Sequence, residues 1–160
     1  MSPQFPWVYP FGEDGPRRGH VVLRPIVPLT LVGTDASTPV FALIDSGCEH
    51  VLAAPWLAND VGVDPDSAHD ELDLGIGGEV IRVRFVDLLL RLHPPGGTDD
   101  EFVEWSTEVG LVDHWRPTFP VLLGQRGFFD RYTVTINRQS QAVAVEDWDA
   151  FDERFGIPLA

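Results

Sequence analysis

Short stretches in which apolar and polar positions alternate make up most of this chain. Between residues 81 and 92 the apolar side chains first occupy odd positions and then even positions. This change of parity predicts a strand with a bulge or a bend near Val86 and Asp87. Further strands are predicted over residues 102–112, 132–136 and 142–145, and residues 137–140 would join the last two strands as a hairpin.

Two apolar segments before residue 46 depart from this alternation. Residues 21–33 are rich in β-branched side chains but contain Pro25 and Pro28, which suits edge strands or bends better than a central strand. The sequence VFALID, residues 40–45, is apolar on both parities, as expected of a strand that is buried on both faces. So many short strands predict an all-β fold, a closed barrel or a sandwich.

One segment near the C-terminus, EDWDAFDERFG, has the period of a helix instead. Trp148, Phe151 and Phe155 fall at i, i+3 and i+7, which is one face of a helix. Asp147 lies at its start and Gly156 just past its end, as capping preferences require. We therefore predict a short C-terminal helix whose aromatic face packs against the core or another subunit.

The composition indicates one globular domain. The chain has 160 residues, 44% hydrophobic and 22% charged. Residues 1–19 contain four prolines and three glycines, which predicts an extended N-terminal segment ahead of a single domain over residues 20–160. The formal net charge of -14 argues against nucleic-acid binding and against anionic membrane surfaces, because both need clustered Lys or Arg.

Cysteine content and hydropathy indicate the compartment. A single cysteine excludes an intramolecular disulfide and fits a reducing environment. The first residues lack the apolar stretch of a signal peptide, and no run reaches the roughly 20 apolar residues of a membrane span. We therefore expect a cytoplasmic protein without a membrane partner.

The histidines and the cysteine give no recognisable metal site. The five histidines are scattered, and no HExxH or CxxC spacing occurs. In an extended segment Cys48 and His50 share one face while Glu49 opposes them, which leaves at most two ligands. A nucleophilic Cys48–His50 pair would lack a neighbouring group to orient it. No metal and no cofactor are expected.

Two loops resemble known binding motifs only in part. Residues 64–75, DPDSAHDELDLG, have the aspartate density of a calcium loop, but His69 replaces the glycine that the turn needs. Residues 74–80, LGIGGEV, are rich in glycine, yet Val80 occupies the place of the last glycine in GxGxxG and a strand follows. A solvated acidic loop and a glycine-rich turn are the better interpretations.

Asp45 raises a sharper question, because it follows three apolar residues of a predicted buried strand. A carboxylate in such a place must be hydrogen-bonded, paired or used in chemistry. Ser46 can form a local hydrogen bond and Gly47 lets backbone approach closely, so Asp45-Ser46-Gly47 can form a tight turn that presents the carboxylate.

Together with two later segments, VFALIDSG resembles the active-site strand and loop of retropepsin-like aspartic proteases, whose pattern is apolar-apolar-Asp-Thr/Ser-Gly. LGIGGEVIRVRF resembles the glycine-rich flap hairpin of that family, and FPVLLGQRGFFDRYTVTI resembles its late apolar-apolar-Gly segment. The three matches occur in the order of the family and span about residues 38–145. The resemblance implies a closed barrel of the acid-protease type, to which this chain adds the C-terminal helix predicted above.

The resemblance also implies a function and a set of site residues. Asp45 would be catalytic, with Ser46 and Gly47 fixing its loop. The flap tip would be Ile76, Gly77 and Gly78, and the supporting segment would be Leu122, Leu123 and Gly124. Because the chain has one D-S-G motif, the second aspartate would be Asp45 of a second copy in a two-fold homodimer. The implied reaction is hydrolysis of peptide bonds in a peptide or protein substrate, without a cofactor.

Two other interpretations remain open. A retropepsin-like fold can serve as a catalytically inactive binding or interaction module, since a fold does not fix a function. Alternatively, Asp45 is a hydrogen-bonded turn residue of a structural domain. Gln125 and Arg126 stand where the family often has Arg followed by Asp or Asn, so the polar contacts beneath the site would differ from those of the family.

Overall fold

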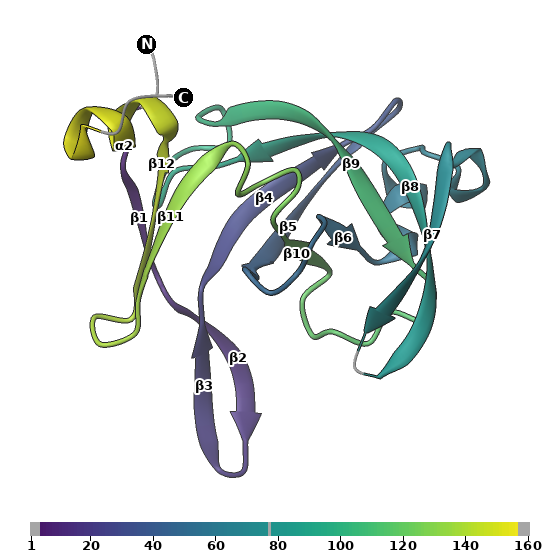
Figure 1. Cartoon of the computed structure of the whole chain (residues 1–160), viewed down its shortest axis with the longest axis horizontal. Helices are drawn as coiled ribbons and strands as arrows, with labels where there is room; N and C mark the ends of the chain where they lie inside the picture. Colours follow the sequence, from purple (N-terminus) through teal and green to yellow (C-terminus); the bar gives the residue numbers. More distant parts are fainter. Residues whose placement is uncertain (1–3, 77, 157–160) are drawn as a thin grey trace.

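The computed structural model describes residues 4–76 and 78–156, and β-strands form most of it (Figure 1). The first strands are β1 (Trp7–Pro10), β2 (Gly12–Arg17), β3 (His20–Arg24), β4 (Ile26–Val32), β5 (Ser37–Ile44) and β6 (Leu52–Ala53). The later strands are β7 (Asp70–Ile76), β8 (Glu79–Leu92), β9 (Val103–Val112), β10 (Val121–Leu123), β11 (Tyr132–Asn137) and β12 (Ala142–Asp147). The helices are α1 (Pro55–Asp60), the 3-10 helix η1 (Pro65–Ser67) and α2 (Trp148–Phe155).

The central sheet closes on itself. Its strand order is β4-β5-β10-β6-β9-β8-β7, and β4 also pairs with β8, so six strands form a ring and β7 extends β8 outward. Closure removes the free edges that an open sheet would expose. The predicted all-β closed barrel with a short C-terminal helix is therefore confirmed.

Two groups of buried side chains fill the barrel. The larger contains most of the buried leucines and valines together with Trp105 and Phe128. The smaller lies toward one end and consists of Leu52, Val83, Phe85 and Val112. The sequence predicted a bulge or a bend in β8, and the bulge is absent because the register with β9 is uninterrupted from Val83 to Leu92. The strand bends instead (Figure 1), so its odd positions face the small cluster and its even positions face the main core.

The edge-strand alternative for β4 and the prediction that β5 is buried on both faces were wrong. β4 is not an edge strand, since it pairs with β5 along its whole length and with β8 from Leu29 to Val32. Pro28 is tolerated because it precedes the residues that pair with β8. β5 is not buried on both faces: Ala42 and Ile44 are buried, whereas Phe41 is 60% exposed.

The two ends of the described chain lie in one small sheet. β12 is the middle strand of the order β1-β12-β11, and Trp7 and Tyr9 of β1 are buried. Residues 7–10 are therefore extended, as predicted, and pair along their whole length with β12. β2 and β3 form a separate hairpin that projects from the body of the protein (Figure 1). The division into a segment over residues 1–19 and a domain over residues 20–160 stays a prediction.

The predicted C-terminal helix is present, with the expected caps. The Asp147 side chain accepts a hydrogen bond from the Ala150 N–H at 2.8 Å, and Gly156 ends the helix with φ 61°. Its aromatic face does not dock among the described residues, because Trp148 is 48% exposed and Phe155 57%. None of the helices in the described part of the chain is long and apolar enough to cross a membrane.

Candidate active site

The loop that carries Asp45 directly follows β5, a strand that lies between β4 and β10 in the barrel. The Asp45 N–H donates to the Leu123 carbonyl at 3.0 Å, and the Cys48 N–H donates to the Asp45 carbonyl at 3.1 Å, which closes a tight turn. The Gly47 N–H donates to Oδ1 of Asp45 at 3.0 Å. The carboxylate is half-buried and held in place by the backbone. The hydrogen bond from the Gly47 N–H offsets the free-energy cost of removing the charge from water.

A second loop, residues 124–126, lies directly against the Asp45 loop. The Gln125 N–H donates to the Cys48 carbonyl at 2.8 Å, and the Arg126 N–H donates to the Glu49 carbonyl at 2.8 Å. A Cβ on Gly124 would lie 2.6 Å from the Cys48 carbonyl oxygen, so glycine is required there. β10, which precedes this loop, pairs with β5 in parallel and aligns Leu123 with Ile44.

A cavity of about 630 Å³ opens beside Asp45. Its apolar wall combines side chains from β6, β7, β8, β9, β10 and the loop after β9, namely Leu52, Leu74, Ile81, Val112, Trp115 and Leu122. Among the described carboxylates that line it, Glu49 pairs with Arg126 at 2.8 Å and Glu79 pairs with Arg116 at 3.4 Å. Asp45 also lines the cavity, and it forms no ion pair with any described residue.

The β7–β8 hairpin covers one side of the cavity. Gly75 and Glu79 line the cavity on either side of the turn. Ile76 pairs with Glu79 in the backbone register, and Gly78 adopts φ 86°. Gly77, the middle residue of the predicted flap tip, lies outside the described residues. Gly75 and Glu79 thus place this end of the hairpin beside the cavity.

The structure brings most of the predicted site residues together. Asp45, Gly47 and Leu122 line the cavity, Leu123 and Gly124 are buried behind it, and Ser46 is exposed at the turn. The roles proposed for these residues stay predictions.

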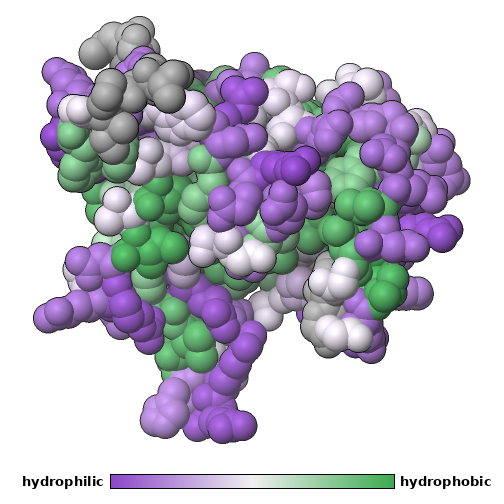
Figure 2. All heavy atoms as spheres, in the orientation of Figure 1, coloured by the Kyte–Doolittle hydropathy of each residue, from purple (hydrophilic) through white to green (hydrophobic). Residues whose placement is uncertain are grey.

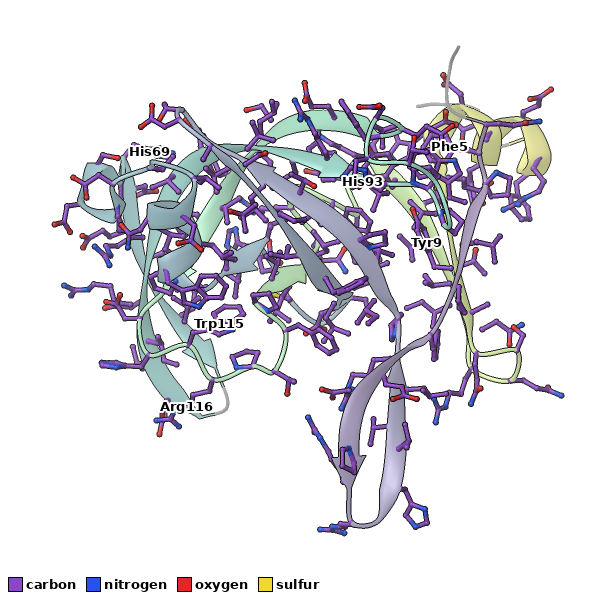
Figure 3. The ribbon with its side chains drawn as sticks, turned by 180° about the vertical axis from the view of Figure 1, so that it is seen from behind. Phe5, Tyr9, His69, His93, Trp115 and Arg116 are labelled. Atoms are coloured by element: carbon purple, nitrogen blue, oxygen red, sulfur yellow. The ribbon has the colours of Figure 1, made fainter. Side chains whose placement is uncertain are left out.

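Sequence reasoning missed the loop between β9 and β10. His114, Trp115, Arg116 and Pro117 of this loop line the cavity opposite the Asp45 loop. Trp115 donates from Nε1 to the Phe119 carbonyl at 3.0 Å, and Arg116 reaches the hairpin through its ion pair with Glu79. Figure 3 shows Trp115 and Arg116 close together near the turn of the β7–β8 hairpin. The sequence did offer a signal for this part of the site: a histidine, a tryptophan, an arginine and a proline follow one another directly after a predicted strand.

The environment of Cys48 opposes nucleophilic chemistry. Burial raises the pKa of the thiol, and the nearby carboxylates of Asp45 and Glu49 raise it further. The thiol donates to the His50 carbonyl at 3.1 Å rather than to the imidazole, and the His50 ring packs edge-on against Phe85 at 5.0 Å. These contacts do not form a Cys–His catalytic pair.

Comparison with known proteins gives structural similarity alone. No protein-family model and no curated protein sequence matches the chain. The EIAV protease complexed with the inhibitor HBY-793 aligns with a TM-score of 0.35 and 14% identity, covering 86% of this chain and 92% of that one. A retropepsin-like aspartic protease from Rickettsia conorii aligns with a TM-score of 0.44 and 14% identity, covering 91% and 96%. Similarity at this level assigns no activity, which must be argued from the residues of the site.

Proposed function

We propose that the protein is an aspartic endopeptidase that works as a homodimer and hydrolyses peptide bonds between two Asp45 carboxylates. The observation that carries this proposal is the Asp45 carboxylate itself. It is fixed by the Gly47 N–H, left without an ion pair among the described residues, and placed at the wall of a largely apolar cavity. A carboxylate held in this way is suited to acid–base chemistry on a bound substrate.

The proposed chemistry needs two such carboxylates with one shared proton, because two like charges at close range cannot both ionise. The unprotonated carboxylate takes a proton from a water molecule, and the resulting hydroxide attacks the scissile carbonyl carbon. The protonated carboxylate donates its hydrogen bond to the carbonyl oxygen, which stabilises the tetrahedral intermediate. The carboxyl that took the proton from water then gives it to the amide nitrogen, and the C–N bond breaks to release an amine and a new carboxyl end. No cofactor takes part in these steps.

Each chain contributes a single Asp-Ser-Gly turn, so the proposed site is complete only in the dimer. The exposed Ser46 lies at the turn, where it can face the same residue of a second copy across a two-fold axis. We therefore propose that Asp45, Ser46 and Gly47 of both copies build the catalytic centre.

The substrate would lie in the cavity as an extended strand beneath the β7–β8 hairpin. Ile76, Gly77 and Gly78 are the proposed flap tip, whose closure would exclude water during the reaction. The apolar wall formed by Leu52, Ile81 and Val112 suits an uncharged substrate side chain next to the cleaved bond. Leu122, Leu123 and Gly124 support the loop from below.

The experiment is to incubate the purified protein with a diverse peptide mixture from mildly acidic to neutral pH and to identify the products by mass spectrometry. We expect Asp45→Asn to lower cleavage by about 10³-fold. Asp100→Asn is the matched control, since it removes the same charge from an exposed loop and should cleave like the parent.

Mixing the two forms tests the dimer directly. A tenfold excess of Asp45→Asn should reduce the activity of a fixed amount of parent protein to about one tenth, because most parent subunits then pair with an inactive copy. Unchanged activity would mean that one chain suffices. A folded, dimeric parent that cleaves nothing would instead favour the catalytically inactive binding module.

A further inference from the structure

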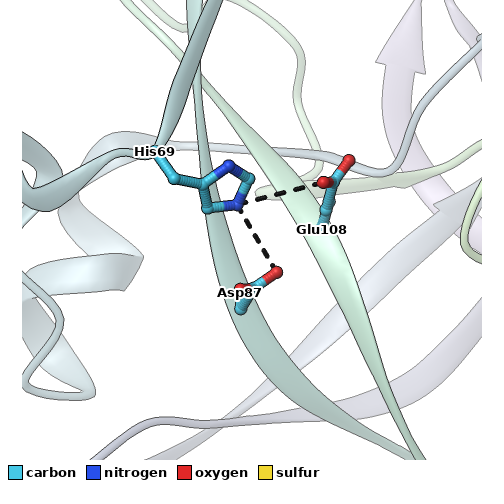
Figure 4. Close-up of side chains that lie close together, drawn as sticks. All are labelled: His69, Asp87 and Glu108. Atoms are coloured by element: carbon cyan, nitrogen blue, oxygen red, sulfur yellow. Dashed lines mark ion pairs between the residues drawn. The ribbon is translucent and has the colours of Figure 1, made fainter.

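Three ligand-type side chains meet on the outer wall of the barrel, away from the Asp45 cavity. His69 directly precedes β7, Asp87 lies on β8 and Glu108 lies on β9. Nε2 of His69 is 3.5 Å from Oδ1 of Asp87 and 4.0 Å from Oε1 of Glu108 (Figure 4). One donor atom from each of the three residues lies within 4.8 Å of the others.

The backbone fixes the relative positions of these three residues. Asp87 and Glu108 are directly opposite each other in the uninterrupted β8–β9 ladder. The His69 N–H donates to the Phe85 carbonyl at 3.1 Å, which holds the histidine beside the same ladder two residues before Asp87. Three donors on separate segments are thus brought together by main-chain bonds, independently of any ligand.

Among the described residues, no arginine pairs with the carboxylate of Asp87 or of Glu108. Two carboxylates directly opposite on neighbouring strands repel each other, and in the described part of the chain the ion-pair partner of both is His69. Most exposed carboxylates on nearby strands have an arginine instead, as Arg91 pairs with Glu104 at 2.6 Å on the same two strands. The surface over β7 and β8 is mostly hydrophilic (Figure 2), in a chain of net charge -14.

We infer that His69, Asp87 and Glu108 bind a divalent transition-metal ion, for which Zn²⁺ is the best fit. Imidazole nitrogen and carboxylate oxygen are both ordinary zinc ligands, and an imidazole disfavours Mg²⁺ and Ca²⁺, which select oxygen donors. Tetrahedral zinc with bond lengths of about 2.1 Å needs its ligand atoms about 3.4 Å apart. The donor atoms, which lie within 4.8 Å of one another, therefore have to approach by at most about 1.4 Å, with water as the fourth ligand.

A bound ion would hold the β7–β8 hairpin at the end opposite its turn. His69 and Arg116 lie toward opposite ends of this part of the molecule (Figure 3), so the ion would sit far from the cavity rim and take no part in the chemistry there. By binding one residue before β7 and one residue each on β8 and β9, it would clamp three segments together. An ion that binds the folded chain and not the unfolded chain stabilises it by RT ln(1 + L/Kd), where L is the free ion concentration, so the gain grows with that concentration relative to Kd.

The test is isothermal titration calorimetry with Zn²⁺, combined with thermal unfolding of the same samples. We expect saturable binding of one ion per chain and a rise of several degrees in the unfolding midpoint. His69→Ala should weaken zinc binding at least about tenfold and remove the thermal shift. His20→Ala, an exposed histidine on the β2–β3 hairpin, is the matched control and should behave like the parent.

Asp87→Asn separates metal binding from a purely structural role. Removing one of two opposed charges should leave the metal-free protein at least as stable as the parent, yet zinc should no longer raise its unfolding midpoint. Mg²⁺ at the same concentration should produce no shift. The proposal is overturned if zinc does not bind saturably, or if His69→Ala binds it as tightly as His20→Ala does.

Discussion

The side-chain amide of Gln125 donates a hydrogen bond of 2.7 Å to the backbone carbonyl of Ser46, 79 residues earlier in the chain. Both residues are exposed, so this bond joins two loops at the surface. The backbone N–H of Gln125 also donates to the Cys48 carbonyl, so this one residue holds the Asp45 loop at two points. Gln125 therefore positions the loop without touching the cavity.

Gln125→Glu should disturb the loop while leaving the fold intact, because a carboxylate cannot donate this bond and faces a carbonyl oxygen instead. We expect the free energy of unfolding to fall by about 1 kcal/mol. If the protein is a peptidase, kcat should drop about tenfold while KM changes little. Denaturant unfolding and peptide cleavage measure the two effects. Gln139→Glu in the β11–β12 turn is the control, and equal effects from both variants would contradict this role.

Gly124→Ala should destabilise the protein strongly. The new Cβ would lie 2.2 Å from the His50 carbonyl oxygen, and that carbonyl belongs to backbone that cannot yield easily. We expect a loss of about 3 kcal/mol or failure to fold, measured by urea unfolding. Gly75→Ala meets nothing within 4 Å and should change stability by less than about 1 kcal/mol. Similar losses in both variants would show that the close approach at Gly124 is relaxed in solution.

Asp14 should make stability depend on pH at the base of the β2–β3 hairpin. Its buried carboxylate contacts Arg24 at 2.7 Å and Arg17 at 2.9 Å, and the Arg24 hydrogen bond is the main cause of a pKa below the ordinary value. A lowered pKa contributes stability above the unfolded-state pKa, about 3.9, and this contribution disappears as the pH falls through the folded-state pKa.

Asp14→Asn should therefore cost about 2 kcal/mol at pH 7 and progressively less below about pH 4. Urea unfolding of parent and variant at several pH values measures the difference. Asp100→Asn, on an exposed loop, should show no such convergence because that aspartate has no ion pair in the described part of the chain. A difference that stays constant down to acid pH would contradict the assignment.

Cys48 should react slowly with alkylating reagents at pH 8. Burial first and then the Asp45 and Glu49 charges raise the pKa of the thiol, so little thiolate is present. Asp45→Asn removes one of these charges and should speed the reaction several-fold, whereas Asp100→Asn should not. Mass spectrometry of timed samples gives both rates. A parent thiol that reacts as fast as free cysteine would contradict the buried environment.

Local signals in the sequence were sufficient for the elements that depend on local chemistry. The bounds of α2 follow from Asp147 and Gly156, because a cap forms within a few residues of the group that it satisfies. The turn between Asn137 and Ala142 was likewise predicted from local sequence, because a short polar segment separates two strand patterns there. The closeness of the Asp45 and Gly124 loops followed from resemblance to a known family, not from periodicity.

Features that depend on pairing between strands far apart in the chain could not be predicted from the sequence. The closure of β4 on β8 joins Leu29 to Leu92, and no local pattern specifies such a register. Without that closure, β4 with its prolines resembled an edge strand. The convergence of His69, Asp87 and Glu108 has the same origin, since it needs the β8–β9 register. The exposure of Trp148 was missed because the helical period identifies a face but not what covers it.

The pairing of β1 with β12 has a consequence for synthesis of the chain. Trp7 is opposite Val145, so β1 waits for a partner strand that is made 138 residues later. At 5–20 residues per second, β1 stays without its partner for roughly 7 to 28 s on the ribosome. During that time Trp7 and Tyr9, buried in the finished protein, remain available to chaperones or to other nascent chains.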